Sequence, residues 1–274
     1  MRWLAHCAGA LQALQAELLI VGQTHDDLVA ARALPATLAV RRLPPRRDGG
    51  LIWLVAGVVD ADGPDALNAV IYLLDPDDPT SMFPEALALK RQCVVHRKPF
   101  IATFTQAREW VGLEQVLRGT APDAALAAQL DPAGHSIALV AHDACKPALV
   151  EFARRHFTLL GRAARRIATG TTGGLLNELA ATLRPTAAPW VERLHSGPDG
   201  GDAEIAREIL AGRCDRVIFF EDPHVAREHE ADIQLLERSA RMLRDGVPCH
   251  TEPVSAERWA TAATRAIAAQ RTDR

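Results

Sequence analysis

The sequence has very little lysine, and it has no excess of positive charge. Lys90, Lys98 and Lys146 are the only lysines among 31 basic residues, so arginine carries nearly all of the positive charge. The formal net charge is −3, whereas nucleic-acid scaffolds usually carry a basic excess. We therefore expect no nucleic-acid partner, and a lysine inside a motif becomes a candidate functional residue.

Paired cysteines and long apolar runs are also missing. The five cysteines show neither a CxxC pair nor a short metal-ligand spacing, which favours a reducing compartment and predicts no metal site. The longest apolar run, Leu51–Val59, is too short to cross a bilayer. His6, Gln12 and Gln15 interrupt any apolar stretch that could act as a signal peptide. These features predict a cytoplasmic protein with no membrane partner.

Several short motifs occur twice in the same order, about 150 residues apart. The apolar segment Val70–Asp75 and the similar segment Val217–Asp222 are both followed by proline. The tripeptide Asp-Gly-Gly occurs at 48–50 and again at 199–201. Repeated anchors at nearly one offset indicate a tandem duplication.

We therefore predict two tandem α/β domains. The first covers residues 1–117, the second covers 135–274, and the Ala-, Asp- and Pro-rich segment 118–134 is the expected linker. The composition, with 48% hydrophobic and 24% charged residues, is ordinary for globular domains of this size.

Short apolar segments alternate with helical patterns through the second copy. Helices between such strands imply βαβ crossovers, hence a mainly parallel sheet with helices on both faces in three layers. Parallel strands end at one edge of the sheet, and α/β proteins bind ligands there. The expected strands are Ile137–Ala141, Arg166–Thr169, Trp190–His195, Val217–Phe220 and Val247–His250.

Two glycine-rich loops follow expected strands. The loop Gly170–Gly174 precedes a helix expected from Leu175, and its backbone amides and threonine hydroxyls suit a phosphate. A plain turn with helix-capping threonines explains it equally well. The loop Ser196–Asp202 ends in a carboxylate at a helix start, where Asp202 as a simple N-cap is the more economical interpretation.

Further polar residues follow the first and fourth expected strands. His142 and Asp143 lie beside the rare Lys146, although a solvated turn would look the same. Asp222 is followed by His229, but no cysteine or second histidine joins them at metal-ligand spacing. Acids, histidines, a lysine and two glycine loops at one edge suit proton abstraction beside a carbonyl, together with phosphate handling.

Four motifs resemble those of bacterial methylglyoxal synthases in order and spacing. They are Ala141–Lys146, Ala168–Gly173, Ser196–Asp202 and Phe219–Pro223, within a region of resemblance that covers about 135–260. The resemblance implies two methylglyoxal-synthase-like domains and a lyase that converts dihydroxyacetone phosphate into methylglyoxal and inorganic phosphate without a cofactor.

The resemblance also implies a role for each residue. Asp202 would be the base that removes a proton from the hydroxymethyl carbon, and His229 would polarise the carbonyl. Asp143, Asp222 and Asp232 would complete the catalytic set by lining or orienting the site. The substrate- and phosphate-binding set would be His142, Lys146, Thr169, Thr171, Thr172, Ser196 and Gly197. Because the family enzyme resembles a homohexamer, a chain with two copies is expected to form a homo-oligomer, such as a trimer.

The sequence departs from the family in both copies. In the second, Gly174 replaces an asparagine and Glu221 replaces an aromatic residue. In the first, Leu51 occupies the position of Asp202 and Met82 that of His229, which predicts a catalytically silent domain. Two alternatives of the same fold remain: a non-catalytic phosphate-ligand-binding regulatory module, as in carbamoyl phosphate synthetase, and a domain like inosinate cyclohydrolase.

Overall fold

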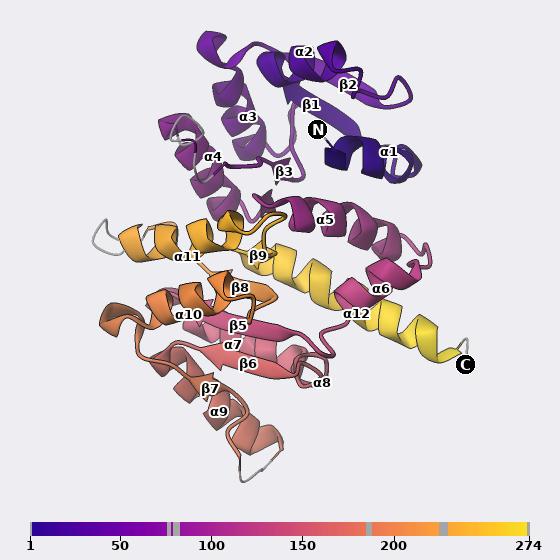
Figure 1. Cartoon of the computed structure of the whole chain (residues 1–274). Helices are drawn as coiled ribbons and strands as arrows, with labels where there is room; N and C mark the ends of the chain where they lie inside the picture. Colours follow the sequence, from indigo (N-terminus) through magenta and orange to yellow (C-terminus); the bar gives the residue numbers. More distant parts are fainter. Residues whose placement is uncertain (1, 76–77, 79–82, 185–187, 225–229, 273–274) are drawn as a thin grey trace.

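The structure is a computed structural model that describes residues 2–272, apart from 76–77, 79–82, 185–187 and 225–229. Figure 1 shows two α/β regions, one from each half of the chain, with the long C-terminal helix passing between them. The fold class predicted from the sequence, helices around parallel sheets, is confirmed.

The second half contains a five-stranded parallel sheet in the order β7-β6-β5-β8-β9. Two strands are shorter than expected, because only the residues that pair with a neighbouring strand count as strand. The strands are β5 (Ser136–Ala141), β6 (Arg165–Ala168), β7 (Glu192–Arg193), β8 (Arg216–Phe220) and β9 (Cys249–His250).

Helices cover both faces of this sheet. Successive strand residues point to opposite faces, so Ile137 and Leu139 of β5 enter one buried cluster while Ala138 and Val140 enter the other. The first cluster is covered by α7 (Lys146–Arg155), α8 (Phe157–Leu160), α9 (Gly170–Leu183) and α12 (Pro253–Thr272). The second is covered by α10 (Gly201–Leu210) and α11 (Glu230–Met242).

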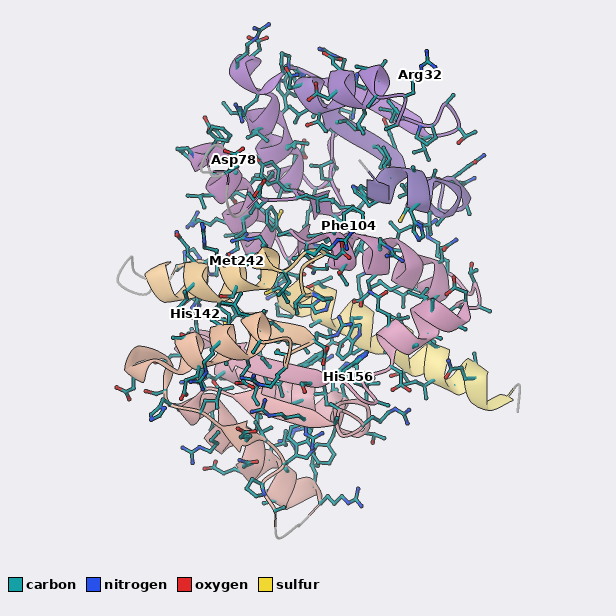
Figure 2. All side chains as sticks on the ribbon, viewed as in Figure 1. Arg32, Asp78, Phe104, His142, His156 and Met242 are labelled. Atoms are coloured by element: carbon teal, nitrogen blue, oxygen red, sulfur yellow. The ribbon has the colours of Figure 1, made fainter. Side chains whose placement is uncertain are left out.

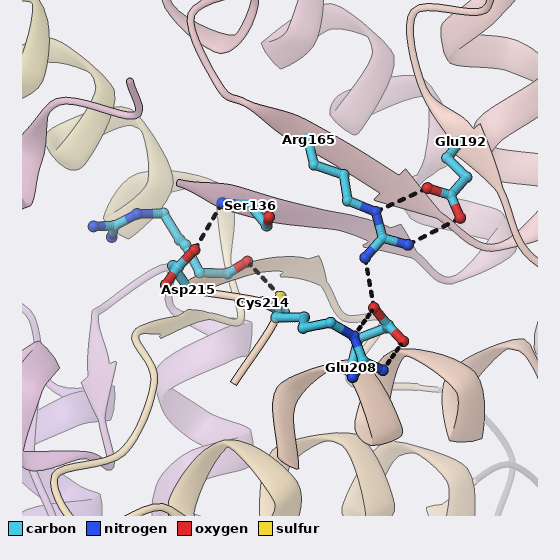
Figure 3. A network of polar contacts seen from close by, with 8 residues as sticks. Ser136, Arg165, Glu192, Glu208, Cys214 and Asp215 are labelled. Atoms are coloured by element: carbon cyan, nitrogen blue, oxygen red, sulfur yellow. Dashed lines mark hydrogen bonds and ion pairs between the residues drawn. The ribbon is translucent and has the colours of Figure 1, made fainter. Parts of the chain in front are cut away.

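A polar network fixes the edge of the sheet (Figure 3). Arg165 at the start of β6 donates to Glu192 of β7 at 2.8 and 2.9 Å and to Glu208 of α10 at 2.5 Å. Arg213 donates to the same Glu208 at 2.6 Å. Because Glu208 is buried, its two arginine partners compensate for the loss of water around its carboxylate.

The first half contains two separate parallel pairs instead of one sheet. Strand β1 (Glu17–Val21) pairs with β2 (Ala39–Leu43), and β3 (Val70–Ile71) pairs with β4 (Phe100–Ile101). Within the described residues no ladder joins the two pairs. The other described elements of this half are α1 (Arg2–Ala13), α2 (Gly22–Ala30), a 3-10 turn η1 (Arg46–Asp48), α3 (Gly50–Val59), α4 (Pro84–Val95) and α5 (Phe104–Leu117).

Helix α5 belongs to both halves. Its Val111 lies in the core around α1 and β1, whereas Leu113 and Val116 lie in the core under the five-stranded sheet. Figure 2 labels Phe104, the first residue of α5, between the two halves. Within the segment expected to be a linker, α6 (Ala124–Leu130) forms, and its Leu130 is fully buried in the same core.

A buried ion pair also joins the halves. Arg216 of β8 donates to both carboxylate oxygens of Glu109 in α5, at 2.7 and 2.6 Å, and to His250 at 2.9 Å. Its guanidinium lies 4.4 Å from the centre of the Trp259 ring. Among the described residues, no helix is both long and apolar enough to cross a membrane.

Candidate active site

The carboxyl ends of the five parallel strands meet at one edge of the second sheet. The chain passes from β5 to β6 and β7 on one side, then crosses to β8 and β9 on the other. The reversal lies between β5 and β8, and open α/β sheets bind ligands at such a switch point. His142 follows β5 and Asp222 follows β8.

His142 and Asp222 are in direct contact at this point. The backbone N–H of Asp222 donates to Nδ1 of His142 at 2.7 Å. The imidazole also packs edge-on against Phe219, with ring centres 5.0 Å apart. Because Nδ1 accepts, the neutral ring carries its hydrogen on Nε2, which makes that atom a donor.

The sequence predicts that Gly170–Gly174 is a loop before a helix. In the structure this segment is instead the first turn of α9. Glycine has low helix propensity, which is why the helix was expected only from Leu175. Thr169 is the N-cap, and the amide of Gly173 donates to its carbonyl at 2.7 Å. The first amides of a helix have no intrahelical acceptor, so this turn directs backbone donors and the positive end of the helix toward the strand edge.

The two glycine segments pack against each other. The amide of Gly170 donates to the carbonyl of His195 at 2.8 Å, and a Cβ on Gly170 would lie 3.1 Å from the amide nitrogen of Ser196. The buried hydroxyls of Thr169 and Thr172 lie 3.4 Å apart, whereas Thr171 is exposed. The contact between the two hydroxyls joins Thr169 to Thr172, and the backbone contacts of Gly170 bring Ser196 beside them.

Asp202 lies over the second glycine segment. A Cβ on Gly197 would lie 3.0 Å from Oδ2 of Asp202, so the carboxylate sits against the backbone of that segment. The segment forms the 3-10 turn η4 (Gly197–Asp199), and Ser196 donates to Asp199 at 2.5 Å. Asp202 is half-buried at the start of α10.

Lys146 is paired with Asp143. They follow β5, and Nζ of Lys146 donates to Asp143 at 2.5 Å. The lysine side chain is 16% exposed and the carboxylate 96% exposed. This lysine therefore lies beside the strand edge, although its partner faces solvent.

Two predicted catalytic residues cannot be placed in the site. His229 lies outside the described residues, as does Met82 in the first half. Asp232 lies in α11, but its side chain is also outside the described part of the structure. The other predicted site residues form two adjacent groups, one at the end of β5 and β8 and one at the ends of β6 and β7.

Sequence reasoning missed two basic residues beside the site. Arg193 donates from Nε to the carbonyl of Gly170 at 3.0 Å, and its guanidinium passes 3.7 Å from where a Cβ on Gly174 would lie. A Cβ at 174 would lie at an ordinary contact distance from this arginine, so the glycine there gives no sign of the contact. Lys90 of the first half contacts Glu221 at 2.9 Å, and the sequence carries no local sign of that contact.

The thiol nearest this edge is not activated. Burial raises the pKa of Cys145, and the nearby Asp222 and Glu221 raise it further. A surface hollow of about 420 Å³ lies elsewhere, at the amino ends of the strands, beside Asp215, Arg216 and Val247. It does not coincide with the predicted site residues.

Comparisons with known proteins give one consistent result. The chain is similar to the methylglyoxal synthase of Thermus thermophilus, with 40% identity over 122 residues, which is 44% of this chain and 89% of that protein. It is also similar to the methylglyoxal synthases of Agrobacterium fabrum, with 44% identity over 38% of this chain and 76% of that protein, and of Cupriavidus taiwanensis, with 41% identity over 44% and 84%.

A solved structure of methylglyoxal synthase from Elizabethkingia anophelis shares 34% identity over 45% of this chain and 74% of that one, with a TM-score of 0.36. No family model matches the chain. The matched stretch of these relatives is less than half of the chain but most of each relative. On its sequence identity with the Thermus and Cupriavidus proteins, the chain belongs to the methylglyoxal synthase family.

Proposed function

We propose that the chain is a methylglyoxal synthase whose second half converts dihydroxyacetone phosphate into methylglyoxal and inorganic phosphate. The observation that carries the proposal is the position of Asp202. Its carboxylate lies against Gly197, on a segment whose neighbour Ser196 packs against the threonine turn of α9. An acid and an anion-binding helix end on adjoining segments suit removal of a proton from a phosphorylated substrate.

The first step is proton transfer. Asp202 takes a proton from the hydroxymethyl carbon, and the C–H electron pair forms the carbon–carbon double bond of an ene-diolate. The carbonyl oxygen takes the negative charge and needs a fixed donor. Nε2–H of His142 is a suitable donor, because Nδ1 is held by the amide of Asp222. By family resemblance His229 is a second donor.

The second step is elimination. The hydroxyl on the first carbon loses its proton and becomes the aldehyde, the carbon–carbon double bond shifts to the carbon that carries the phosphate, and the C–O bond breaks as phosphate leaves. The oxyanion on the middle carbon takes a proton, which gives an enol. The enol product then rearranges to methylglyoxal. The amides of Thr171 and Thr172 at the start of α9, the hydroxyls of Thr169, Thr172 and Ser196, and the ammonium of Lys146 would hold the phosphate throughout, which fixes the reacting carbon near Asp202.

A direct assay tests the proposal. Purified protein is incubated with dihydroxyacetone phosphate, and methylglyoxal and phosphate are measured together. Equal amounts of both products are expected. Phosphate release without methylglyoxal would indicate a phosphatase, and binding of the substrate without either product would favour the regulatory module of the same fold.

We further propose that the first half is a degenerate copy of the second, joined through residues 118–134, and that the chain forms a homo-oligomer. In this proposal the first half packs where a second subunit would otherwise pack, so three chains would complete a six-domain assembly. Light scattering on the purified protein tests the assembly, and a strict monomer would contradict it.

A further inference from the structure

A buried ion cluster joins the first half to the second immediately before Asp222. Nζ of Lys90, in α4, lies 2.9 Å from the carboxyl of Glu221 and 2.6 Å from that of Glu237 in α11. The three side chains are 14, 8 and 9% exposed. A buried carboxyl depends on such a partner, because it has lost its contact with water.

The next residue of α4 makes a second contact on the other side of Asp222. Nε of Arg91 donates to the carbonyl of Pro223 at 3.1 Å. Consecutive residues of the first half therefore hold the two residues that flank Asp222. Within the second half, the amide of Glu221 donates to the carbonyl of Thr251 at 3.2 Å.

The segment Glu221–Pro223 includes the hydrogen bond to His142, and the geometry of that bond depends on the position of the segment. The amide of Asp222 donates to Nδ1 of His142 at 2.7 Å, and this bond fixes which ring nitrogen carries the hydrogen. A displacement of the segment by a fraction of an ångström would lengthen the bond and turn the ring. Catalytic groups need to be held within about 0.5 Å of their working positions.

We propose that Lys90 and Arg91 are positioning residues, through which the first half holds Asp222 and His142 in their working geometry. This inference rests on the proposed function, since it assigns the first half a part in the same site. It also gives the buried glutamate at 221 a role: its carboxyl is the point where the lysine of the other half is attached.

The experiment compares two kinds of variant. Some remove the contacts of α4 with Glu221 and Pro223, and one removes a contact between the halves that lies elsewhere. Arg91→Ala removes one exposed contact. The double variant Lys90→Met/Glu221→Gln removes the other contact without leaving the buried carboxyl of Glu221 unpartnered, and Glu237 keeps Arg241 at 3.9 Å. Arg258→Ala is the matched control, because Arg258 joins α12 to Glu114 of α5, with Nε 2.6 Å from Oε1.

Each variant is measured by kcat, KM, Tm and the ¹⁵N shift of Nδ1 in His142. We expect kcat to fall about 10-fold in Arg91→Ala and in the double variant, with the His142 signal displaced and KM nearly unchanged. Arg258→Ala should lower Tm and leave both kcat and the His142 signal as in the wild type. Lys90→Arg should keep most of the wild-type kcat, because it retains the cation.

Two results would overturn the inference. One is wild-type kcat and His142 signal in both releasing variants. The other is an equal loss of kcat in Arg258→Ala, which would mean that any loosening of the halves has the same effect. If the wild type makes no methylglyoxal, the proposed function fails instead, and the His142 signal still decides whether the first half positions this segment.

Discussion

The second glycine segment, 196–201, has a counterpart in the first half at 45–50, and the two share their backbone geometry. Gly49 has φ 87° and Gly200 has φ 96°. A Cβ on Gly50 would lie 2.1 Å from the carbonyl oxygen of Pro44, and one on Gly201 would lie 2.1 Å from that of His195. In each half a 3-10 turn leads through this left-handed glycine into a helix.

The two segments share Asp-Gly-Gly, but the side chains on either side of it differ. The second half has Ser196, Gly197 and the half-buried Asp202, whereas the first has Pro45, Arg46 and the buried Leu51. The comparison separates two requirements. Glycines are needed in both halves for the turn itself, but the acid and hydroxyl are present only in the half to which we assign the chemistry.

Replacement of Asp202 should have the largest effect on activity. Asp202→Asn keeps the shape of the side chain but removes the base, so we expect kcat to fall by about 10³-fold with an unchanged fold. Methylglyoxal formation and circular dichroism check the two parts. Glu178→Gln, an exposed acid on α9, is the control and should retain full activity. Undiminished turnover in Asp202→Asn would refute the assignment of the base.

Paired glycine substitutions separate the turn from the chemistry. Gly50→Ala and Gly201→Ala each force a methyl group against a backbone carbonyl oxygen, and overpacking of this kind costs about 1–3 kcal/mol. Urea unfolding should show a similar loss in both, while only Gly201→Ala should also lose most activity. Gly9→Ala, which has open space around its Cβ position, should not destabilise the chain. Equal losses of activity in the two halves would contradict the comparison.

Removal of Lys146, the lysine proposed to bind the phosphate, should have a smaller effect, mainly on KM. Lys146→Ala is expected to raise KM about 10-fold and to change kcat little, because the lysine binds substrate and transition state alike. Steady-state kinetics measure both constants. Lys98→Ala, which removes a first-half lysine that contacts the carbonyl of Gly57, is the control. A fall in kcat at constant KM would argue against a binding role.

Replacement of Glu221, the buried acid beside the site, should have the smallest effect. It should change how the stability of the chain depends on pH. Burial raises the pKa of Glu221 to about 8, since lost hydration and repulsion by Glu237 outweigh the attraction of Lys90. The folded chain therefore holds a proton that the unfolded chain releases near pH 4.5, so this group stabilises below pH 4.5 and loses that contribution as pH rises to about 8.

Glu221→Gln removes this titration and should make the fall in Tm between pH 5 and 8 shallower. The corresponding residue of the first half, Leu74, does not titrate, so Leu74→Ala should leave the slope as in the wild type. Identical slopes in the wild type and Glu221→Gln would show that Glu221 is already ionised in the folded chain.

Much of the second half could be predicted from its sequence, because its central strands β5 and β8 are short apolar runs that end in polar motifs. The start of α9 could not, since glycine is a poor helix former and the contacts of Gly170 with His195 and Arg193 join residues far apart in sequence. The contacts of Lys90 and Arg193 were also out of reach. They join residues far apart in sequence, and no periodicity or spacing encodes such a meeting.

Helix α5 contributes side chains to the cores of both halves, so the second half depends on it. A fragment that began at residue 135 would leave Arg216 without the carboxylate of Glu109 and would uncover the surface that Leu113 and Val116 fill. An uncompensated buried guanidinium and an open apolar surface favour unfolding and aggregation. The chain is therefore expected to melt in a single cooperative step, and residues 135–274 are not expected to fold stably without α5.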